Sequence, residues 1–395
     1  MRLLAIYSTE DLLGGGEISF TLTLQLVQQS GWNILAIIPG EGPLARFLEQ
    51  RGISYQVAPI EPLRQLRNLR YLIRPKPDWM KVALRYRPHL IHCNSVRAAL
   101  YGQALGHNLR VPTVFTARKT ESDGLIDYFL MRRLDAVVCV SQAVKQRFPD
   151  FLGSEKLNVI YNAVDPKRFS EPRTAAQQLR NRWLAGAEGP LVGVVGRLSP
   201  IKGQHLVVEA APRILAELPA VRFVFVGSED SSYPGHESKL RDRVRELALQ
   251  DRVLFCGFRS DIECIYQALD LVLFPSRSEG FGRIIIEAGA ARRAVVAGDI
   301  EVIREILPPS LHDLLVPLDN VDVLADRTVK LLRDDALRSE KALQLYDHVC
   351  SRYAPEIHRR EILELYRKLT SSQKHSAAKP ATKAEGDHVR DREDP

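Results

Sequence analysis

The segment Pro275-Ser-Arg-Ser-Glu-Gly-Phe-Gly-Arg-Ile-Ile-Ile-Glu-Ala-Gly-Ala290 decides how this chain folds and where it binds a ligand. It follows the apolar run at residues 269–274, which predicts a buried strand, and it passes through two glycines into a helical pattern. A strand that leads into a helix is typical of a parallel α/β sheet, where ligands bind at the carboxyl ends of the strands. We therefore expect Glu279 on a binding loop and Glu287 on the helix that follows it.

The start of that helix predicts an anion site. The backbone amides of Phe281, Gly282 and Arg283 would point toward a negative charge, because the first amides of a helix have no partner within it. Glu287 stands among apolar and small neighbours, where a carboxylate is costly unless a partner such as a ribose hydroxyl or a cation satisfies it. Either glutamate alone would indicate a solvated surface residue, but this setting favours two carboxylates beside a phosphate site.

Seven residues separate the two glutamates and include Gly-Phe-Gly, a pattern that resembles the donor site of retaining GT-B glycosyltransferases of family 4 (glycosyl transferases group 1). Further segments match that family in order and spacing, and together they form a specific signal: a glycine-rich loop at 14–17, domain-closing segments at 140–143 and 159–165, and a diphosphate-binding segment at 195–203. The resemblance covers most of the chain. It implies an α/β, GT-B fold, with two Rossmann-like doubly wound parallel-sheet domains that face a central cleft.

Two cations follow another predicted strand. The apolar run at residues 191–195 ends just before Arg197 and Lys202, which places both at the same edge of the sheet as Glu279. Two positive charges there can neutralise a diphosphate and help it to leave. The chain has no Asp-x-Asp pair, the usual carboxylate ligands of a divalent metal bound to a sugar nucleotide. We expect catalysis without a metal and without a cofactor.

The resemblance implies a role for each matching position. Arg197, Lys202 and Glu279 would be catalytic, and Glu287 would bind the nucleotide ribose. The remaining donor-binding residues, of which the pair at 257–258 would border the nucleobase, would be Gly196, Gly257, Phe258, Gly280, Phe281, Gly282 and Arg283. The acceptor side would be formed by Gly15, Gly16, Glu17, His92 and Arg118.

Three positions depart from the family pattern. Arg118 stands where many members place an active-site histidine, so the acceptor side is expected to differ from theirs. Arg292-Arg293-Ala294 replaces a glycine-proline pair after the second glutamate, and residues 308–316 have no glycine where the family often has them. We expect a reshaped loop beside the donor.

Apolar runs alternate with amphipathic stretches in two series, and 395 residues exceed the usual size of one core. The runs lie at 3–7, 34–38, 54–58, 89–93, 113–116 and 136–140, then at 191–195, 222–226, 253–255, 269–274, 294–297 and 314–316. We expect an acceptor-side domain at 1–168, a nucleotide-sugar domain at 169–350, a helix that crosses back to the first domain at 351–370, and a disordered tail at 371–395.

Composition and charge restrict the compartment and the partners. None of the five cysteines forms a Cys-x-x-Cys pair, the N-terminus enters a strand directly, and no apolar run approaches membrane-spanning length, so a cytoplasmic protein is expected. The net charge of +7 indicates anionic partners. The stretch from Arg64 to Arg87 interleaves cations with apolar and aromatic residues, which fits docking on the inner face of the plasma membrane and equally a solvated helix face. No nucleic-acid-binding motif is present.

The predicted function is retaining hexosyl transfer from a nucleotide-diphosphate sugar to a saccharide or lipid-linked acceptor, in cell-surface polysaccharide or lipopolysaccharide biosynthesis. Retention would come from attack on the front face of the sugar, with the departing phosphate taking the proton of the acceptor. One alternative is a UDP-sugar epimerase of the same architecture. Another is a non-catalytic glycan-binding protein, against which the intact Glu279, Glu287, Arg197 and Lys202 argue.

Overall fold

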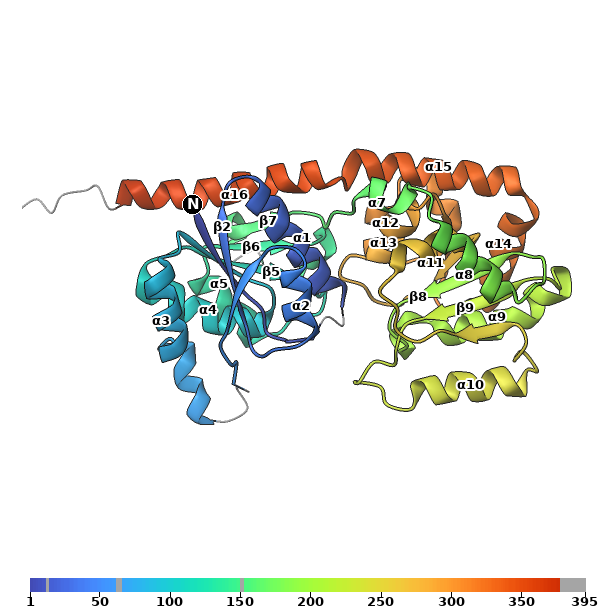
Figure 1. The fold of residues 1–395 in the computed structure, drawn as a ribbon, viewed down its shortest axis with the longest axis horizontal. Coiled ribbons are helices and arrows are strands. Elements are labelled where there is room, and N and C mark those ends of the chain that lie inside the picture. The colour runs from blue at the N-terminus through green and yellow to red at the C-terminus, as the bar shows by residue number, and fades with distance from the viewer. Residues whose placement is uncertain (12–13, 62–65, 150–152, 377–395) are drawn as a thin grey trace, which may run out of the picture.

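The computed structural model describes residues 1–11, 14–61, 66–149 and 153–376. In this part of the chain the strands form two separate parallel sheets, one in each half of the molecule (Figure 1). The first has seven strands in the order β3-β2-β1-β4-β5-β6-β7, and the second has six in the order β10-β9-β8-β11-β12-β13. The predicted fold class of two doubly wound parallel-sheet domains is confirmed.

The sequence predicts every one of these strands except β7, whose residues were not among the apolar runs. The first sheet contains β1 (Arg2–Ile6), β2 (Asn33–Ile38), β3 (Ser54–Val57), β4 (Leu90–Cys93), β5 (Thr113–Ala117), β6 (Ala136–Cys139) and β7 (Leu157–Val159). The second contains β8 (Leu191–Val195), β9 (Arg222–Val226), β10 (Val253–Phe255), β11 (Leu271–Phe274), β12 (Ala294–Gly298) and β13 (Leu315–Val316).

Helices connect successive strands and cover the sheets. In the first half they are α1 (Gly15–Gln29), α2 (Pro43–Glu49), α3 (Pro77–Tyr86), α4 (Val96–Leu109), α5 (Leu125–Arg133) and α6 (Gln142–Gln146). Those that follow are α7 (Pro166–Ser170), α8 (Thr174–Leu184), α9 (Gln204–Glu217), α10 (His236–Glu246), α11 (Ile262–Ala268), α12 (Arg283–Ala290), α13 (Glu301–Ile306), α14 (Val321–Arg333), α15 (Asp335–Arg352) and α16 (Pro355–Ser376). Short 3-10 turns are η1 (Leu66–Leu72), η3 (Ser154–Lys156), η4 (Pro200–Lys202) and η5 (Pro309–Leu314).

The central strands are apolar on both faces because helices bury both. All residues of β5, β6, β8 and β12 are buried. Two glycines bring α4 close to the first sheet: a Cβ at Gly102 would lie 2.3 Å from Cys93 Sγ, and one at Gly106 would lie 1.9 Å from Thr113 Oγ1. Larger residues at either position would therefore push the helix off the sheet.

The strand order reverses at one point in each sheet. In the first sheet this switch point lies between β1 and β4, and in the second it lies between β8 and β11. Crevices outside the carboxyl ends of strands at a switch point are the usual ligand sites of such sheets. The glycine-rich loop follows β1, Arg197 follows β8, and Glu279 follows β11. Three motifs that the sequence singled out thus lie at the two switch points.

The last helix returns to the first domain. A break at Tyr353 and Ala354, just before Pro355, separates α15 from α16, because proline cannot continue the preceding helix. Figure 1 shows α16 running along the first domain, where Ile362 and Tyr366 are buried in its core. The prediction of a disordered tail from residue 371 is wrong for 371–376, which continue α16, since extending an anchored helix costs little. Residues 377–395 lie outside the described ranges.

Candidate active site

The loops after β8 and β11 pack directly on each other. Gly203, which ends η4, has φ 71° and lies so near residue 275 that a Cβ would be 2.1 Å from the Pro275 carbonyl oxygen. Only glycine fits this left-handed conformation and close approach. The contact brings Lys202, at the end of η4, beside Glu279, and their Nζ and Oε1 atoms are 2.5 Å apart.

Both cations that the sequence assigns to a diphosphate pair with carboxylates. Besides the Lys202–Glu279 pair, an Arg197 guanidinium nitrogen lies 3.0 Å from Asp230 Oδ2. The Arg197 side chain remains 53% exposed and that of Lys202 is 21% exposed, so both charges can still be reached from solvent. An incoming dianion would compete with the two carboxylates for these cations.

Glu287 is buried, and each of its two carboxylate oxygens accepts a hydrogen bond from the protein. Arg283 donates to Glu287 Oε1 from Nε at 2.9 Å and from Nη2 at 2.6 Å. The Tyr266 hydroxyl donates to Oε2 at 3.1 Å. A cation, which was one of the two partners expected from the sequence, therefore satisfies this carboxylate together with the Tyr266 hydroxyl, which was not expected.

The predicted nucleobase border lies beside β9. The turns that follow β8 and β9 touch, because a Cβ at Gly227 would be 2.0 Å from the Gly196 carbonyl oxygen. The Gly227 amide donates to the Gly257 carbonyl at 2.9 Å, which aligns a third strand end. Phe258 follows and is 60% exposed, so its ring is free to contact a planar group.

The side chains of two arginines, Arg283 and Arg118, pack against the glycine-rich loop of the first domain. A Cβ at Gly15 would be 2.8 Å from Arg283 Cδ, and one at Gly16 would be 3.1 Å from Arg118 Nε. Arg283 Nη1 also donates to Ser19 Oγ at 2.9 Å, which ties the donor helix α12 to α1 of the other domain. The missing side chains of these glycines make room for the two guanidinium groups.

Arg118 has unused hydrogen-bond donors. Its Nη2 donates to Asn94 Oδ1 at 2.8 Å and to the Gly16 carbonyl at 3.2 Å. Its Nε and Nη1 are buried and have no partner among the residues that the structure describes. Burial lowers the pKa of Arg118 to about 10, and the charge of Glu17 opposes that shift. Unpaired buried donors are costly, so this guanidinium favours an acceptor supplied from outside the protein.

The carboxyl group of Glu17 is influenced by charges from both domains. Burial raises the pKa of its carboxyl group, while Arg118 from the first domain and Arg197 from the second act to lower it. Glu17 is in the first turn of α1, where the exposed amides of the helix also favour a negative charge. The two switch points are therefore close enough to share one electrostatic environment.

The expected acceptor contact of His92 is not supported by its surroundings. The ring is buried, with Nδ1 2.5 Å from the Tyr366 hydroxyl and Nε2 2.7 Å from Thr116 Oγ1. Both ring nitrogens are thus occupied by the protein, and burial holds the pKa of His92 well below its ordinary value. The structure assigns this histidine to the attachment of α16.

The donor loop touches the first domain directly. Gly280 lies so near Arg118 that a Cβ would be 1.7 Å from the Arg118 carbonyl oxygen. Ser141 Oγ donates to the Gly280 carbonyl at 2.8 Å, and the Gln142 amide at the start of α6 donates to Glu305 of α13 at 2.7 Å. These contacts close one domain on the other around the candidate site.

Sequence reasoning missed four residues of this site: Asp230, Tyr266, Ser19 and Asn94. Asp230 and Asn94 follow β9 and β4, so their positions after strand ends could have identified them. Tyr266 and Ser19 lie inside helices and gave no signal, because they meet Glu287 and Arg283 only after the helices pack. No group of three or more His, Cys, Asp or Glu side chains that could hold a metal occurs within the described ranges.

Two protein-family models match this chain. The model described as Glycosyltransferase Family 4 matches residues 13–168, and the one described as Glycosyl transferases group 1 matches residues 189–334. The lipopolysaccharide core biosynthesis mannosyltransferase of Rhizobium leguminosarum bv. viciae is 29% identical over 290 residues, 71% of this chain and 80% of the relative. That of Rhizobium meliloti is 29% identical over 274 residues, 69% of this chain and 76% of the relative.

Solved structures share the two-domain arrangement. HepE of Anabaena, in complex with UDP and glucose, has a TM-score of 0.82 at 24% identity and covers 93% of this chain and 99% of its own. Sucrose-phosphate synthase of Thermosynechococcus elongatus has a TM-score of 0.77 at 20% identity and covers 94% of this chain and 100% of its own. At these identities the likeness concerns the fold alone, and it confirms the GT-B fold.

Proposed function

This chain belongs to the glycosyltransferases of family 4, the glycosyl transferases group 1, and we propose that it moves a hexose from a nucleotide-diphosphate donor to a saccharide or lipid-linked glycan acceptor. The observation that carries the proposal is the meeting of the two switch points. Lys202 and Glu279 form an ion pair there, and the charges of Arg118 and Arg197 both act to lower the pKa of Glu17. Relatives named for lipopolysaccharide core biosynthesis support a role in cell-surface glycan assembly.

The proposed donor is a nucleotide-diphosphate sugar, as in a crystal structure of HepE with UDP-glucose. Its diphosphate would take Arg197 and Lys202 from their carboxylate partners, which frees Glu279 for hydroxyls of the donor sugar. Glu287 would bind the ribose, and Phe258 would border the nucleobase. The amides at the start of α12 add positive potential for the phosphates.

The proposed reaction retains the anomeric configuration. The bond between the anomeric carbon and the leaving phosphate oxygen breaks, and the acceptor oxygen attacks from the same face. The departing phosphate takes the proton of the acceptor hydroxyl, so no dedicated base is required. Negative charge grows on the diphosphate as the bond breaks, and Arg197 and Lys202 stabilise it more in the transition state than in the ground state. We propose that no divalent metal takes part.

The acceptor would lie against the glycine-rich loop. Glu17 can accept a hydrogen bond from an acceptor hydroxyl, and Arg118 offers two unpaired donors to acceptor oxygens. Arg118 would then hold the acceptor where many family members use a histidine. A planar guanidinium matches a carboxylate or phosphate better than a hydroxyl, which favours an anionic acceptor.

A donor screen tests this proposal. UDP-glucose, UDP-galactose and GDP-mannose are each incubated with the protein and with saccharide or lipid-linked acceptors, and release of nucleotide diphosphate is measured with and without EDTA. Acceptor-dependent release that persists in EDTA, with retained configuration of the product by NMR, is expected. Isomerised nucleotide sugar without acceptor would instead indicate an epimerase. Absence of turnover with measurable glycan binding would indicate a binding protein, and activity that EDTA abolishes and magnesium restores contradicts the metal-free mechanism.

We also propose that the protein works at the inner face of the plasma membrane, with the stretch up to Arg87 against anionic lipid; Arg64 lies outside the described residues. In this stretch Ile73 is 63% exposed and Leu84 is 58% exposed, and Arg70 and Arg74 are exposed as well. None of the helices in the described ranges is long and apolar enough to span a bilayer.

Sedimentation with phosphatidylglycerol vesicles tests this membrane contact. Each cation near an anionic surface contributes about 1 kcal/mol, so changing Arg70 and Arg74 together to glutamate should weaken binding about thirtyfold or more at low salt. The same change at Arg97 and Arg182, on exposed parts of other helices, is the control. Wild-type protein that stays in the supernatant at low salt contradicts the proposal.

A further inference from the structure

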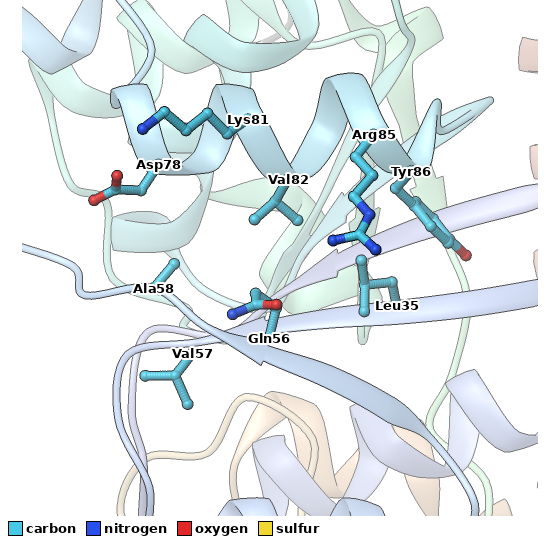
Figure 2. Close-up of a pocket in the computed structure, with 9 residues that line it drawn as sticks. All are labelled: Leu35, Gln56, Val57, Ala58, Asp78, Lys81, Val82, Arg85 and Tyr86. Atoms are coloured by element: carbon cyan, nitrogen blue, oxygen red, sulfur yellow. The ribbon is translucent and has the colours of Figure 1, made fainter.

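A groove lies between the edge of the first sheet and α3 (Figure 2). Its volume is about 700 Å³, within the range of ligand sites. Within the described residues β3 is the last strand of the sheet and pairs only with β2, so no described strand pairs with the other side of its backbone. The apolar floor comes from Leu35, Val57 and Val82. In the proposed reaction this groove has no assigned role.

Three charged residues of α3 line this groove. Figure 2 shows Arg85 and Val82 pointing from α3 toward Leu35 and Gln56, with Lys81 lying along the helix toward Asp78. No hydrogen bond or ion pair of Asp78, Lys81 or Arg85 is found among the residues that the structure describes. Lys81 and Arg85 are one helical turn apart, and Figure 2 shows the Lys81 side chain directed toward Asp78 and that of Arg85 directed toward the sheet.

We propose that this groove binds an anionic saccharide, a segment of glycan that carries carboxylate or phosphate groups. The forked guanidinium of Arg85 and the ammonium of Lys81 match those groups. The Gln56 amide, the Asp78 carboxylate and the free edge of β3 can donate to or accept from sugar hydroxyls. The C–H face of a sugar ring fits against Leu35 and Val82.

The surroundings favour a saccharide over the other anionic ligands. A lipid tail would need a continuous apolar channel, whereas polar groups interrupt this floor. Single-stranded nucleic acid would need rings on which bases stack, but Tyr86 is half-buried and its hydroxyl is bonded to the Asn33 carbonyl at 2.8 Å. The exposed Ile73 and Leu84, proposed above for lipid contact, are not among the groove residues. The two ligands would therefore use different faces of one segment.

This inference extends the proposed function, because a glycan held in the groove would belong to the acceptor. The direct test needs no donor. Titration calorimetry compares tetragalacturonate with neutral maltotetraose on the full chain. Wild type should bind the charged tetramer in a salt-sensitive manner and the neutral one at least about tenfold more weakly, since a charge-assisted pair contributes on the order of that factor.

Matched variants assign the binding to the groove. Lys81→Gln with Arg85→Gln should weaken tetragalacturonate binding about tenfold or more, whereas Arg97→Gln with Arg182→Gln, the same change of charge at exposed positions outside the groove, should not. Thermal unfolding and donor hydrolysis without acceptor should be unchanged in both.

Three results would overturn the inference. They are wild-type protein that binds neither tetramer, an equal loss of binding in both double variants, and a groove variant that loses phosphatidylglycerol vesicles but keeps tetragalacturonate. The last of these would identify a lipid headgroup as the ligand. If the titration shows no binding, the proposed sugar transfer is not contradicted. If no sugar transfer is found, the titration still tests whether the groove binds an anionic saccharide.

Discussion

At the scale of single residues, the cations of the candidate site are held in place by carboxylates. Lys202 pairs with Glu279, Arg197 pairs with Asp230, and Arg283 pairs with Glu287. Each pair orients a cation before the donor arrives, which reduces the ordering needed at the moment of reaction. A donor must therefore bind these cations more strongly than a single carboxylate does. A diphosphate can do so because it has several charged oxygens.

We predict that Arg197→Ala and Lys202→Ala lower kcat by about 10²–10³ and change donor affinity much less, because the charge that they stabilise grows as the glycosidic bond breaks. Steady-state kinetics with the preferred donor, together with donor titration, separates the two effects. Arg213→Ala in the same domain, which removes a cation paired with Asp322 and Asp326 on the surface, should keep the wild-type rate. Near wild-type kcat in both site variants would show that the diphosphate lies elsewhere.

At the scale of elements, α16 is attached to the first domain by buried polar contacts. His358 lies 2.8 Å from Thr23 Oγ1 through Nε2 and 2.7 Å from the Tyr161 carbonyl through Nδ1. The Tyr366 hydroxyl meets His92, and its ring lies 5.5 Å from that of Trp32. Both histidines are deeply buried, so this attachment depends on their being neutral.

We predict that this attachment weakens in acid. Burial lowers the pKa of His358 from 6.5 to about 4, so below pH 6.5 the unfolded chain binds a proton that the folded protein does not. Stability is therefore complete above about pH 7 and falls as the pH decreases toward 4. A change from pH 7 to pH 5 should lower the free energy of unfolding by about 2 kcal/mol through this residue.

Urea unfolding at pH 7 and pH 5 measures this effect. In His358→Gln the loss of unfolding free energy between pH 7 and pH 5 should be smaller by about 2 kcal/mol, whatever the stability of this variant at pH 7. His107→Gln, at an exposed position on α4, should keep the pH dependence of the wild type. The same pH dependence in His358→Gln and in wild type would contradict the prediction.

A second element-scale contact explains a departure from the family pattern. Arg293, in the segment that replaces a glycine-proline pair, donates to the Tyr266 and Gln267 carbonyls at 3.1 and 2.9 Å. These are among the last carbonyls of α11, which have no partner within the helix. The arginine thus fixes the helix whose Tyr266 hydroxyl holds Glu287.

At the scale of the whole molecule, closure of the domains depends on backbone contact at Gly280. We predict that Gly280→Ala opens the interface, because the new Cβ would stand 1.7 Å from the Arg118 carbonyl oxygen. The rate should fall by about 10², the typical effect of a misplacement of about 1 Å. Amide hydrogen exchange in residues 140–143 should rise.

Gly40→Ala is the matched control, since its Cβ would find no atom closer than 3.8 Å. Its rate and its exchange should match those of the wild type. Unchanged exchange and kcat in Gly280→Ala would show that the two domains need not be this close for activity.

The sequence alone was sufficient for the fold class and for the strand ends that carry the charged residues, because apolar runs, glycines and helix starts are local signals. The pairing of those charges was decided only by tertiary structure. Lys202 and Glu279 are 77 positions apart, and nothing near either one encodes the other. For the same reason no local pattern indicated that His92 would meet Tyr366, 274 positions away, or that two donors of Arg118 would be buried without a partner among the described residues. Packing sets the burial and the distance that turn a charged residue into a binding group, and packing is a property of the whole chain.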